Sequence, residues 1–149
     1  MRIIFLDYDG VVNTLWFQDV NKSPNFNFPD DNKVNNTQAI GWLNRLCKET
    51  GAKIVVTSTW RKYKNYKECL YNAGLNKEIE IIDKTDDKGY TRIAEIRRWL
   101  AIHPEVESYV ILDDDFIEKD NKHWIKTETY IGITCSIYEM AKNVLMQNL

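Results

Sequence analysis

Strand-like apolar runs that alternate with helical patterns constrain the fold of this chain more than any other feature of its sequence. Apolar runs typical of buried strands cover residues 2–6, 52–56 and 109–112, with shorter candidates at 79–82 and 123–127. Apolar residues at helical spacing cover residues 37–50, 62–73, 91–102 and 136–147. The alternation favours a parallel sheet with helices on both faces, and 149 residues suffice for one such domain. We therefore predict a single Rossmann-like, three-layer α/β/α domain over residues 1–149.

The segment 13–36 does not fit this alternation. It contains Pro24 and Pro29, and its aromatic residues are Trp16, Phe17, Phe26 and Phe28. Its composition predicts an irregular, lid-like excursion with room for a small hairpin. The segment is long for a plain connection, and such loops are often functional. The aromatic residues would either line the mouth of a crevice or form a satellite hydrophobic cluster.

Polar residues follow three of the predicted strands. The sequence Asp-Tyr-Asp-Gly occupies positions 7–10, Thr-Ser-Thr occupies 57–59, and three aspartates occupy 113–115. Parallel strands bring their carboxyl ends to one edge of the sheet, so these acids should converge in one crevice. Crowded carboxylates repel one another unless a hard divalent cation lies between them, and Mg²⁺ prefers such oxygen ligands. The pattern therefore predicts a Mg²⁺ site at that edge.

Several other kinds of site are excluded by the spacing. An EF-hand loop starting at Asp7 would need Gly where Val12 stands and Glu where Gln18 stands. A phosphate-binding P-loop would need a Gly-Lys pair, which the sequence lacks. The two histidines, His103 and His123, lie in no setting that resembles a catalytic triad, so acyl transfer is disfavoured.

Charge and cysteine content indicate the environment. Lys and Arg number 20 against 22 Asp and Glu, which argues against nucleic-acid binding by bulk charge but leaves a local basic patch open. Residues 61–67 interleave basic and aromatic side chains; they would either contact a nucleic acid or form an exposed helix face. The odd set Cys47, Cys69 and Cys135 predicts reduced thiols. Without a membrane span or a signal peptide, we expect a cytoplasmic protein.

The polar clusters resemble the motifs of a known superfamily. The sequence FLDYDGVVN at 5–13 resembles the first motif of haloacid dehalogenase (HAD) proteins, in which D-x-D-G follows a hydrophobic strand. The hydroxyl residues after 54–56 resemble the second motif, and Asp113-Asp114 after Ile111-Leu112 resembles the fourth. VTSTWR at 56–61, together with residues 92–100, is similar to the HAD domains of Swiss Army Knife RNA repair proteins.

The resemblance implies a Mg²⁺-dependent phosphatase that hydrolyses phosphomonoesters through an aspartyl-phosphate intermediate. Asp7 would be the nucleophile, and Asp9 would protonate the leaving oxygen and then activate water. Gly10 would permit the turn that brings both acids to the phosphate. Ser58, favoured over Thr57, would bind the phosphoryl oxygens. The phosphate-binding residues are then Gly10, Thr57, Ser58, Thr59 and Lys88.

A cation must also offset phosphoryl charge, and the superfamily places a Lys or Arg before the fourth motif. We favour Arg92, which opens a predicted helix; Lys88 is the second choice and Lys84 the third. The metal ligands would be Asp7, Asp9, Asp113 and Asp114. Asp115 is expected to cap a helix or face solvent.

No insertion after the second motif is long enough to form a large cap domain. An open site favours a bulky phosphorylated substrate, such as a polynucleotide end, and no obligate protein partner is evident. Two alternatives remain open. One is a phosphatase of a small nucleotide or sugar phosphate, over which residues 13–36 would close. The other is a HAD-like binding module without turnover, against which the intact pair Asp7 and Asp9 argues.

Overall fold

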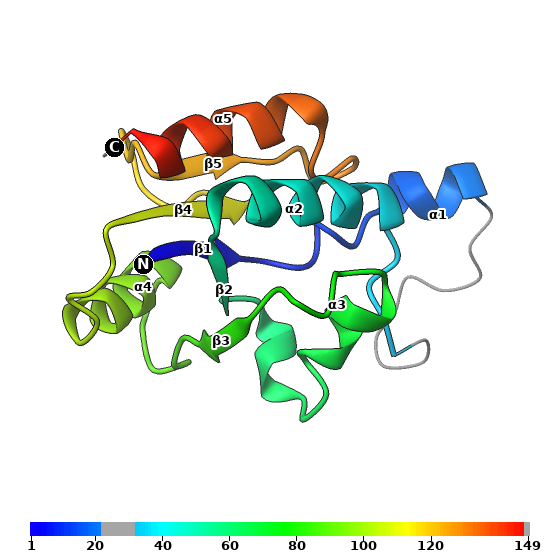
Figure 1. The fold of residues 1–149 in the computed structure, drawn as a ribbon. Coiled ribbons are helices and arrows are strands. Elements are labelled where there is room, and N and C mark those ends of the chain that lie inside the picture. Colours follow the sequence, from blue (N-terminus) through cyan, green and yellow to red (C-terminus); the bar gives the residue numbers. More distant parts are fainter. Residues whose placement is uncertain (22–31, 148–149) are drawn as a thin grey trace.

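A five-stranded parallel sheet forms the centre of the fold (Figure 1). The computed structural model describes residues 1–21 and 32–147. The strands are β1 (Arg2–Leu6), β2 (Lys53–Val56), β3 (Ile81–Lys84), β4 (Ser108–Asp113) and β5 (Trp124–Lys126). They follow the order β3-β2-β1-β4-β5, and every neighbouring pair is parallel. The predicted Rossmann-like α/β class is confirmed.

Helices follow most of the strands. They are α1 (Leu15–Asn21), α2 (Thr37–Thr50), the 3₁₀ helix η1 (Thr59–Lys62), α3 (Glu68–Asn72), α4 (Arg92–Ala101) and α5 (Cys135–Met146). Within the described part of the chain, none of them is both long and apolar enough to cross a membrane. The side chains of Asn36, Thr91 and Thr134 cap α2, α4 and α5 by accepting hydrogen bonds from backbone N–H groups. The three cysteines are unpaired thiols.

Alternating side chains of each central strand divide the core into two layers. Ile4 and Leu6 of β1 belong to the cluster that α2 and α5 cover, and these two helices lie side by side (Figure 1). Ile3 and Phe5 point to the opposite face, where they join Ile96 and other residues of α4. Because β1 is buried on both faces, its sequence is a continuous apolar run rather than an alternating one.

The connection between β2 and β3 differs from the prediction. A helix was expected over 62–73, but the structure has η1 and the short α3 with a turn between them. Tyr63 adopts an extended backbone, with φ −87° and ψ 144°, and this conformation ends η1. Strand β3 also begins two residues later than the predicted 79–82, and its register with β2 shifts between Ile54 and Val55.

The segment 13–36 contains a helix where an irregular excursion was expected. The Thr14 hydroxyl accepts a hydrogen bond from the Phe17 N–H at 3.3 Å, as a helix-capping residue does, and α1 follows. Trp16 and Phe17 lie half-buried on α1, with ring centroids 6.2 Å apart. The predicted aromatic residues Phe26 and Phe28 lie outside the described residues, as do Pro24 and Pro29.

Four buried polar residues join the two ends of this segment; we call them the asparagine knot, and they are Asn13, Thr14, Asn35 and Asn36. Asn35 exchanges two hydrogen bonds of 2.8 Å with the Thr14 backbone, and its own N–H donates to the Asn13 side chain at 2.9 Å. Asn36 donates to the Thr14 hydroxyl at 3.0 Å. The chain thus leaves and rejoins the fold at one point, directly after the first polar cluster.

Candidate active site

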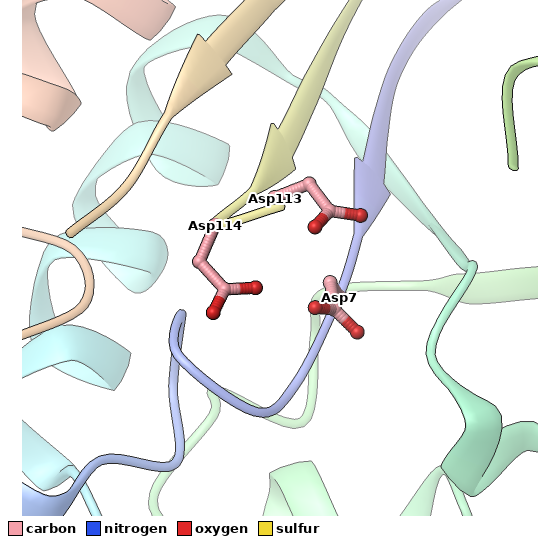
Figure 2. A group of neighbouring side chains, drawn as sticks. All are labelled: Asp7, Asp113 and Asp114. Atoms are coloured by element: carbon pink, nitrogen blue, oxygen red, sulfur yellow. The ribbon is translucent and has the colours of Figure 1, made fainter. Parts of the chain in front are cut away.

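Three carboxylates meet beyond the carboxyl ends of β1 and β4 (Figure 2). Asp7, Asp113 and Asp114 each offer an oxygen, and these oxygens lie within 4.8 Å of one another. The strand register explains this: the Asp7 N–H donates to the Leu112 carbonyl at 3.1 Å, so Asp7 and Asp113 become neighbours across the sheet. Both are nearly inaccessible, at 7% and 0% exposure.

The electrostatics of this group favour a cation. Burial raises the pKa of Asp7 well above its ordinary value, and the nearby Asp113 raises it further, while Arg92 opposes the rise. Burial likewise raises the pKa of Asp113. Buried carboxylate oxygens at such short separations are the donor set that suits a hard divalent ion. The residues therefore fit the Mg²⁺ that the sequence predicts.

Arg92 is the predicted cation that the fold brings to these acids. It is the first residue of α4, and its Nη1 lies 2.6 Å from Asp113 Oδ2 and 3.2 Å from Asp7 Oδ1. Burial would lower the pKa of Arg92, but the two carboxylates outweigh burial and raise it. Lys88 is exposed and does not line the cavity that holds Asp7. The Lys84 ammonium donates instead to the Arg61 carbonyl at 2.9 Å.

A tight turn after Asp7 places Asp9 and Gly10. The Tyr8 carbonyl accepts hydrogen bonds from the N–H groups of residues 11–13 at 2.9–3.1 Å. Gly10 has φ +79°, in the left-handed region that favours glycine. A Cβ there would also lie 2.1 Å from Asp114 Oδ2. Glycine is thus required twice, for the turn and for the approach of the Asp114 carboxylate.

Asp9 lies beside the carboxylate group but not within it. Its Oδ1 accepts a hydrogen bond from Asn13 Nδ2 at 3.0 Å, and its Oδ2 accepts one from Trp60 Nε1 at 3.2 Å. The residue is exposed and lines the same cavity as Asp7. The two D-x-D-G acids therefore occupy different environments, one buried among carboxylates and one held at the surface by neutral donors.

Of the predicted hydroxyl residues, Thr57 and Ser58 are buried and Thr59 is exposed. The Thr57 N–H donates to the Leu6 carbonyl at 2.9 Å, which places Thr57 next to Asp7 across β1 and β2. Its hydroxyl is fully buried and has no hydrogen-bond partner within the described chain. The Ser58 Oγ accepts from the Trp60 N–H at 3.2 Å and caps η1, whereas Thr59 lines the cavity. Both Thr57 and Ser58 retain a hydroxyl hydrogen to donate, so both stay candidates for binding a phosphoryl oxygen.

A cavity of about 450 Å³ opens over these residues. The predicted site residues that line it are Asp7, Asp9, Thr59, Arg92, Asp113 and Asp114. Trp16 and Phe17, for which the crevice mouth was one of two predicted positions, are not among the lining residues. Two aromatic residues that the sequence analysis did not single out, Tyr90 and Phe116, do line the cavity. Tyr90 comes shortly before the start of α4, and Phe116 directly follows the three aspartates at 113–115. This closeness to predicted site residues is the sequence signal that could have identified them.

A buried ion pair supports the site from behind, and it was also missed. Arg61 Nη2 contacts Glu95 Oε2 at 2.5 Å, and both side chains are at most 10% exposed. Arg61 also donates to the carbonyls of Thr57, Ser58 and Asp86. Its guanidinium therefore ties the end of β2 to the loop before α4 and to α4 itself.

This ion pair changes the interpretation of residues 61–67. Arg61 is buried and unavailable to a nucleic acid, and Tyr66 is half-buried with its carbonyl bound by the Tyr8 hydroxyl. Lys62 and Lys64 are exposed. Nucleic-acid binding by this stretch thus stays a prediction that would rest on its exposed lysines.

Comparison with known protein families finds a match to the family described as the HAD domain in Swiss Army Knife RNA repair proteins. The match covers residues 3–136, a span that includes every predicted site residue from Asp7 to Asp114. No curated protein and no solved structure shows a significant match to the chain.

Proposed function

The chain belongs to the family of HAD domains found in Swiss Army Knife RNA repair proteins, and on this premise we propose that it hydrolyses phosphomonoesters with the help of Mg²⁺. One observation carries the proposal. The buried carboxylate of Asp7 lies at the floor of an open cavity, 3.2 Å from Arg92 and among the oxygens of Asp113 and Asp114. This arrangement provides a nucleophile together with the groups that balance the charge of a phosphoryl group.

In the first step, an Oδ of Asp7 attacks the phosphorus, and the bond from phosphorus to the leaving oxygen breaks. Asp9 gives its proton to that oxygen. In the second step, Asp9 takes a proton from a water molecule, the water oxygen attacks the phosphorus, and the bond to Asp7 breaks. Inorganic phosphate leaves, and both acids return to their starting states.

The surrounding residues supply charge and orientation. Arg92 stands close enough to Asp7 to contact a phosphoryl oxygen bound there, and the hydroxyls of Thr57 or Ser58 would donate to another. Asp7, Asp113 and Asp114 would hold the ion, which when bound offsets the negative charge of the phosphoryl group. The carboxylate of Asp9 lies outside that group and is assigned to proton transfer.

Phosphate release from monoesters tests the proposal. We expect turnover with Mg²⁺, loss of turnover with excess chelator, and none in Asp7→Asn. After rapid quenching, label from a ³²P-phosphomonoester should be trapped on the wild-type protein and be absent from Asp7→Asn. Undiminished turnover in chelator would contradict the role of the metal, and a phosphoenzyme in Asp7→Asn would contradict the assignment of the nucleophile.

We propose a phosphorylated nucleic-acid end as the substrate. The family description supports it, and so does the open cavity, into which a chain end could reach. A second candidate is a free nucleotide, which the cavity volume of about 450 Å³ also accommodates. Comparing phosphate release from phosphorylated oligonucleotides and mononucleotides separates the two.

A further inference from the structure

Two aromatic rings stand in solvent at the cavity that holds Asp7. Tyr90 is fully exposed and Phe116 is 68% exposed, and both line the cavity. Single exposed apolar residues need no explanation, but two large rings on the rim of one catalytic cavity form apolar surface where a substrate would bind.

The loop that carries Tyr90 is fixed from several sides. The Asp86 carboxylate accepts two hydrogen bonds from Arg98, at 2.5 and 3.1 Å, and the Asp86 carbonyl accepts one from Arg61 at 3.1 Å. Gly89 lies so close to α4 that a Cβ there would meet Glu95 Cγ at 2.6 Å. The backbone is therefore held against α4 while the adjacent Tyr90 ring projects into solvent.

The Phe116 ring is also supported. It packs edge-on against Trp124 of β5, with centroids 5.8 Å apart and an interplanar angle of 84°. The preceding turn is fixed by the Asp115 N–H, which donates to Asp113 Oδ1 at 3.0 Å. Trp124 thus supports the Phe116 ring on one side, and much of the ring stays exposed at the cavity that holds the carboxylates.

The charge of the cavity decides what these rings recognise. Arg92 is the one cation among the described residues that line it, and Asp7 and Asp113 already engage that cation. The lining acids are Asp7, Asp9, Glu95, Asp113, Asp114 and Asp115. The lining residues thus offer no second cation for further phosphates of a nucleic-acid chain, so affinity for the leaving group must come from its uncharged parts. A nucleobase offers a flat face for stacking.

Building on the proposed phosphatase function, we propose that Tyr90 and Phe116 form a base-recognition site for the nucleotide that carries the phosphate. The phosphoryl group lies at Asp7, and the base of the same nucleotide stacks on one or both rings. Specificity then resides in the terminal nucleotide, and the rest of a nucleic-acid chain is free to extend out of the open cavity.

The test compares substrates with and without a base. We would measure kcat/KM for adenosine 3′- and 5′-monophosphates and for ribose 5-phosphate. The ratio of nucleotide to ribose 5-phosphate should fall on the order of ten- to a hundredfold in Tyr90→Ala or Phe116→Ala, the range for losing one base–aromatic stack. Tyr90→Phe keeps the ring and should keep the ratio. Ile102→Ala removes an exposed apolar side chain that does not line the cavity, and it should leave both rates unchanged.

The outcomes separate this inference from the proposed function. Phosphate release from all three compounds at a ratio that neither alanine variant changes would overturn the base-recognition site and leave the phosphatase intact. A larger kcat/KM for a phosphotyrosine peptide than for either nucleotide, lost in Tyr90→Ala, would also overturn it, because the rings would then recognise a protein side chain. No phosphate release from these compounds or from acetyl phosphate, a reactive substrate without a ring, would contradict the phosphatase itself.

Discussion

The indole Nε1 of Trp60 donates a hydrogen bond of 3.2 Å to Oδ2 of Asp9. Trp60 lies in η1, after β2, and its ring packs edge-on against Tyr8, with centroids 5.3 Å apart. Trp60, which follows β2, thereby orients Asp9, which follows β1. Since an indole N–H is only a donor, this bond holds the carboxylate of Asp9 by one oxygen and leaves the ring nitrogen no role in proton transfer.

Loss of this bond should slow catalysis. Trp60→Phe keeps an aromatic ring against Tyr8 but removes the donor, so we expect kcat for an alkyl phosphate to fall about tenfold, as for loss of one hydrogen bond to a charged group. The fall should be smaller for an aryl phosphate, whose leaving group needs less help from Asp9. Trp99→Phe is the matched control, because Trp99 Nε1 donates to Asp83 at 2.7 Å outside the cavity. Equal losses in the two variants would contradict the positioning role.

Asp9 itself should separate the two halves of acid–base catalysis. Asp9→Asn leaves the nucleophile in place but removes the acid, so turnover should fall by about 10²–10⁴. The residual rate should depend strongly on the leaving group and be highest for an aryl phosphate. Steady-state rates over a series of phosphates with leaving groups of graded pKa measure this dependence. A loss as complete as in Asp7→Asn for every leaving group would argue against the assigned role.

Arg92 and Lys88 should differ sharply. Arg92→Ala removes the cation between Asp7 and Asp113 and should lower kcat/KM on the order of a hundredfold, since a charge-assisted contact contributes a few kcal/mol. Lys88→Ala removes an exposed charge outside the cavity and should have a minor effect. Phosphate-release kinetics of the two variants check this ranking; the reverse order would make Lys88 the third-motif cation.

Asp114 should have opposite effects with and without metal. After burial itself, the charges of Asp113 and Asp114 raise the pKa of Asp7, which means that the three carboxylates repel one another. Asp114→Asn should therefore stabilise the metal-free protein, and each 1 kcal/mol of relief would raise its Tm by roughly 2–4 °C. Saturating Mg²⁺ should stabilise the wild type more than it stabilises Asp114→Asn. A site filled at 100 times its Kd adds about 2.7 kcal/mol to the free energy of unfolding.

Thermal unfolding in chelator and in excess Mg²⁺ measures both effects. Asp87→Asn serves as a control, because Asp87 is an exposed acid outside the carboxylate group. If Asp114→Asn and the wild type showed the same gain with Mg²⁺, Asp114 would not be a ligand.

The buried pair Arg61–Glu95 should be important for stability. Arg61→Ala leaves Glu95 buried without its ion-pair partner and removes the guanidinium hydrogen bonds to three carbonyls, so the free energy of unfolding should fall by about 3–5 kcal/mol. Arg97 pairs with Glu118 at the surface, and Arg97→Ala should cost less than about 1 kcal/mol. Urea unfolding of both variants compares the two pairs, and similar losses would show that burial of the ion pair adds nothing.

The strands were predictable because burial on both faces makes them continuous apolar runs. β1 was predicted with its observed bounds, Arg2–Leu6. The bounds of β3 were not predicted, because this edge strand ends in two charged residues, Asp83 and Lys84, that do not extend the apolar run. Asp83 accepts a hydrogen bond from Trp99 on α4, a contact between distant parts of the chain that no local pattern reveals.

The same distinction applies to the site. Convergence of Asp7, Asp113 and Asp114 follows from strand order alone, and so it was visible in the sequence. The roles of Trp60 and Glu95 depend on how η1 and α4 pack, and a charge or an indole in a helix is usually exposed or part of the core. Sequence reasoning therefore located the chemical groups but not the residues that hold them.

The asparagine knot has a consequence for how this protein can vary. Asn35 joins the far end of the segment to its start, because its N–H donates to the Asn13 side chain and its side-chain amide donates to the Thr14 carbonyl. Asn13 also donates a hydrogen bond to Asp9, so the asparagine knot lies between this acid and any change of length in the segment that the knot closes. Insertions and deletions between α1 and the knot should therefore be tolerated without moving the catalytic centre.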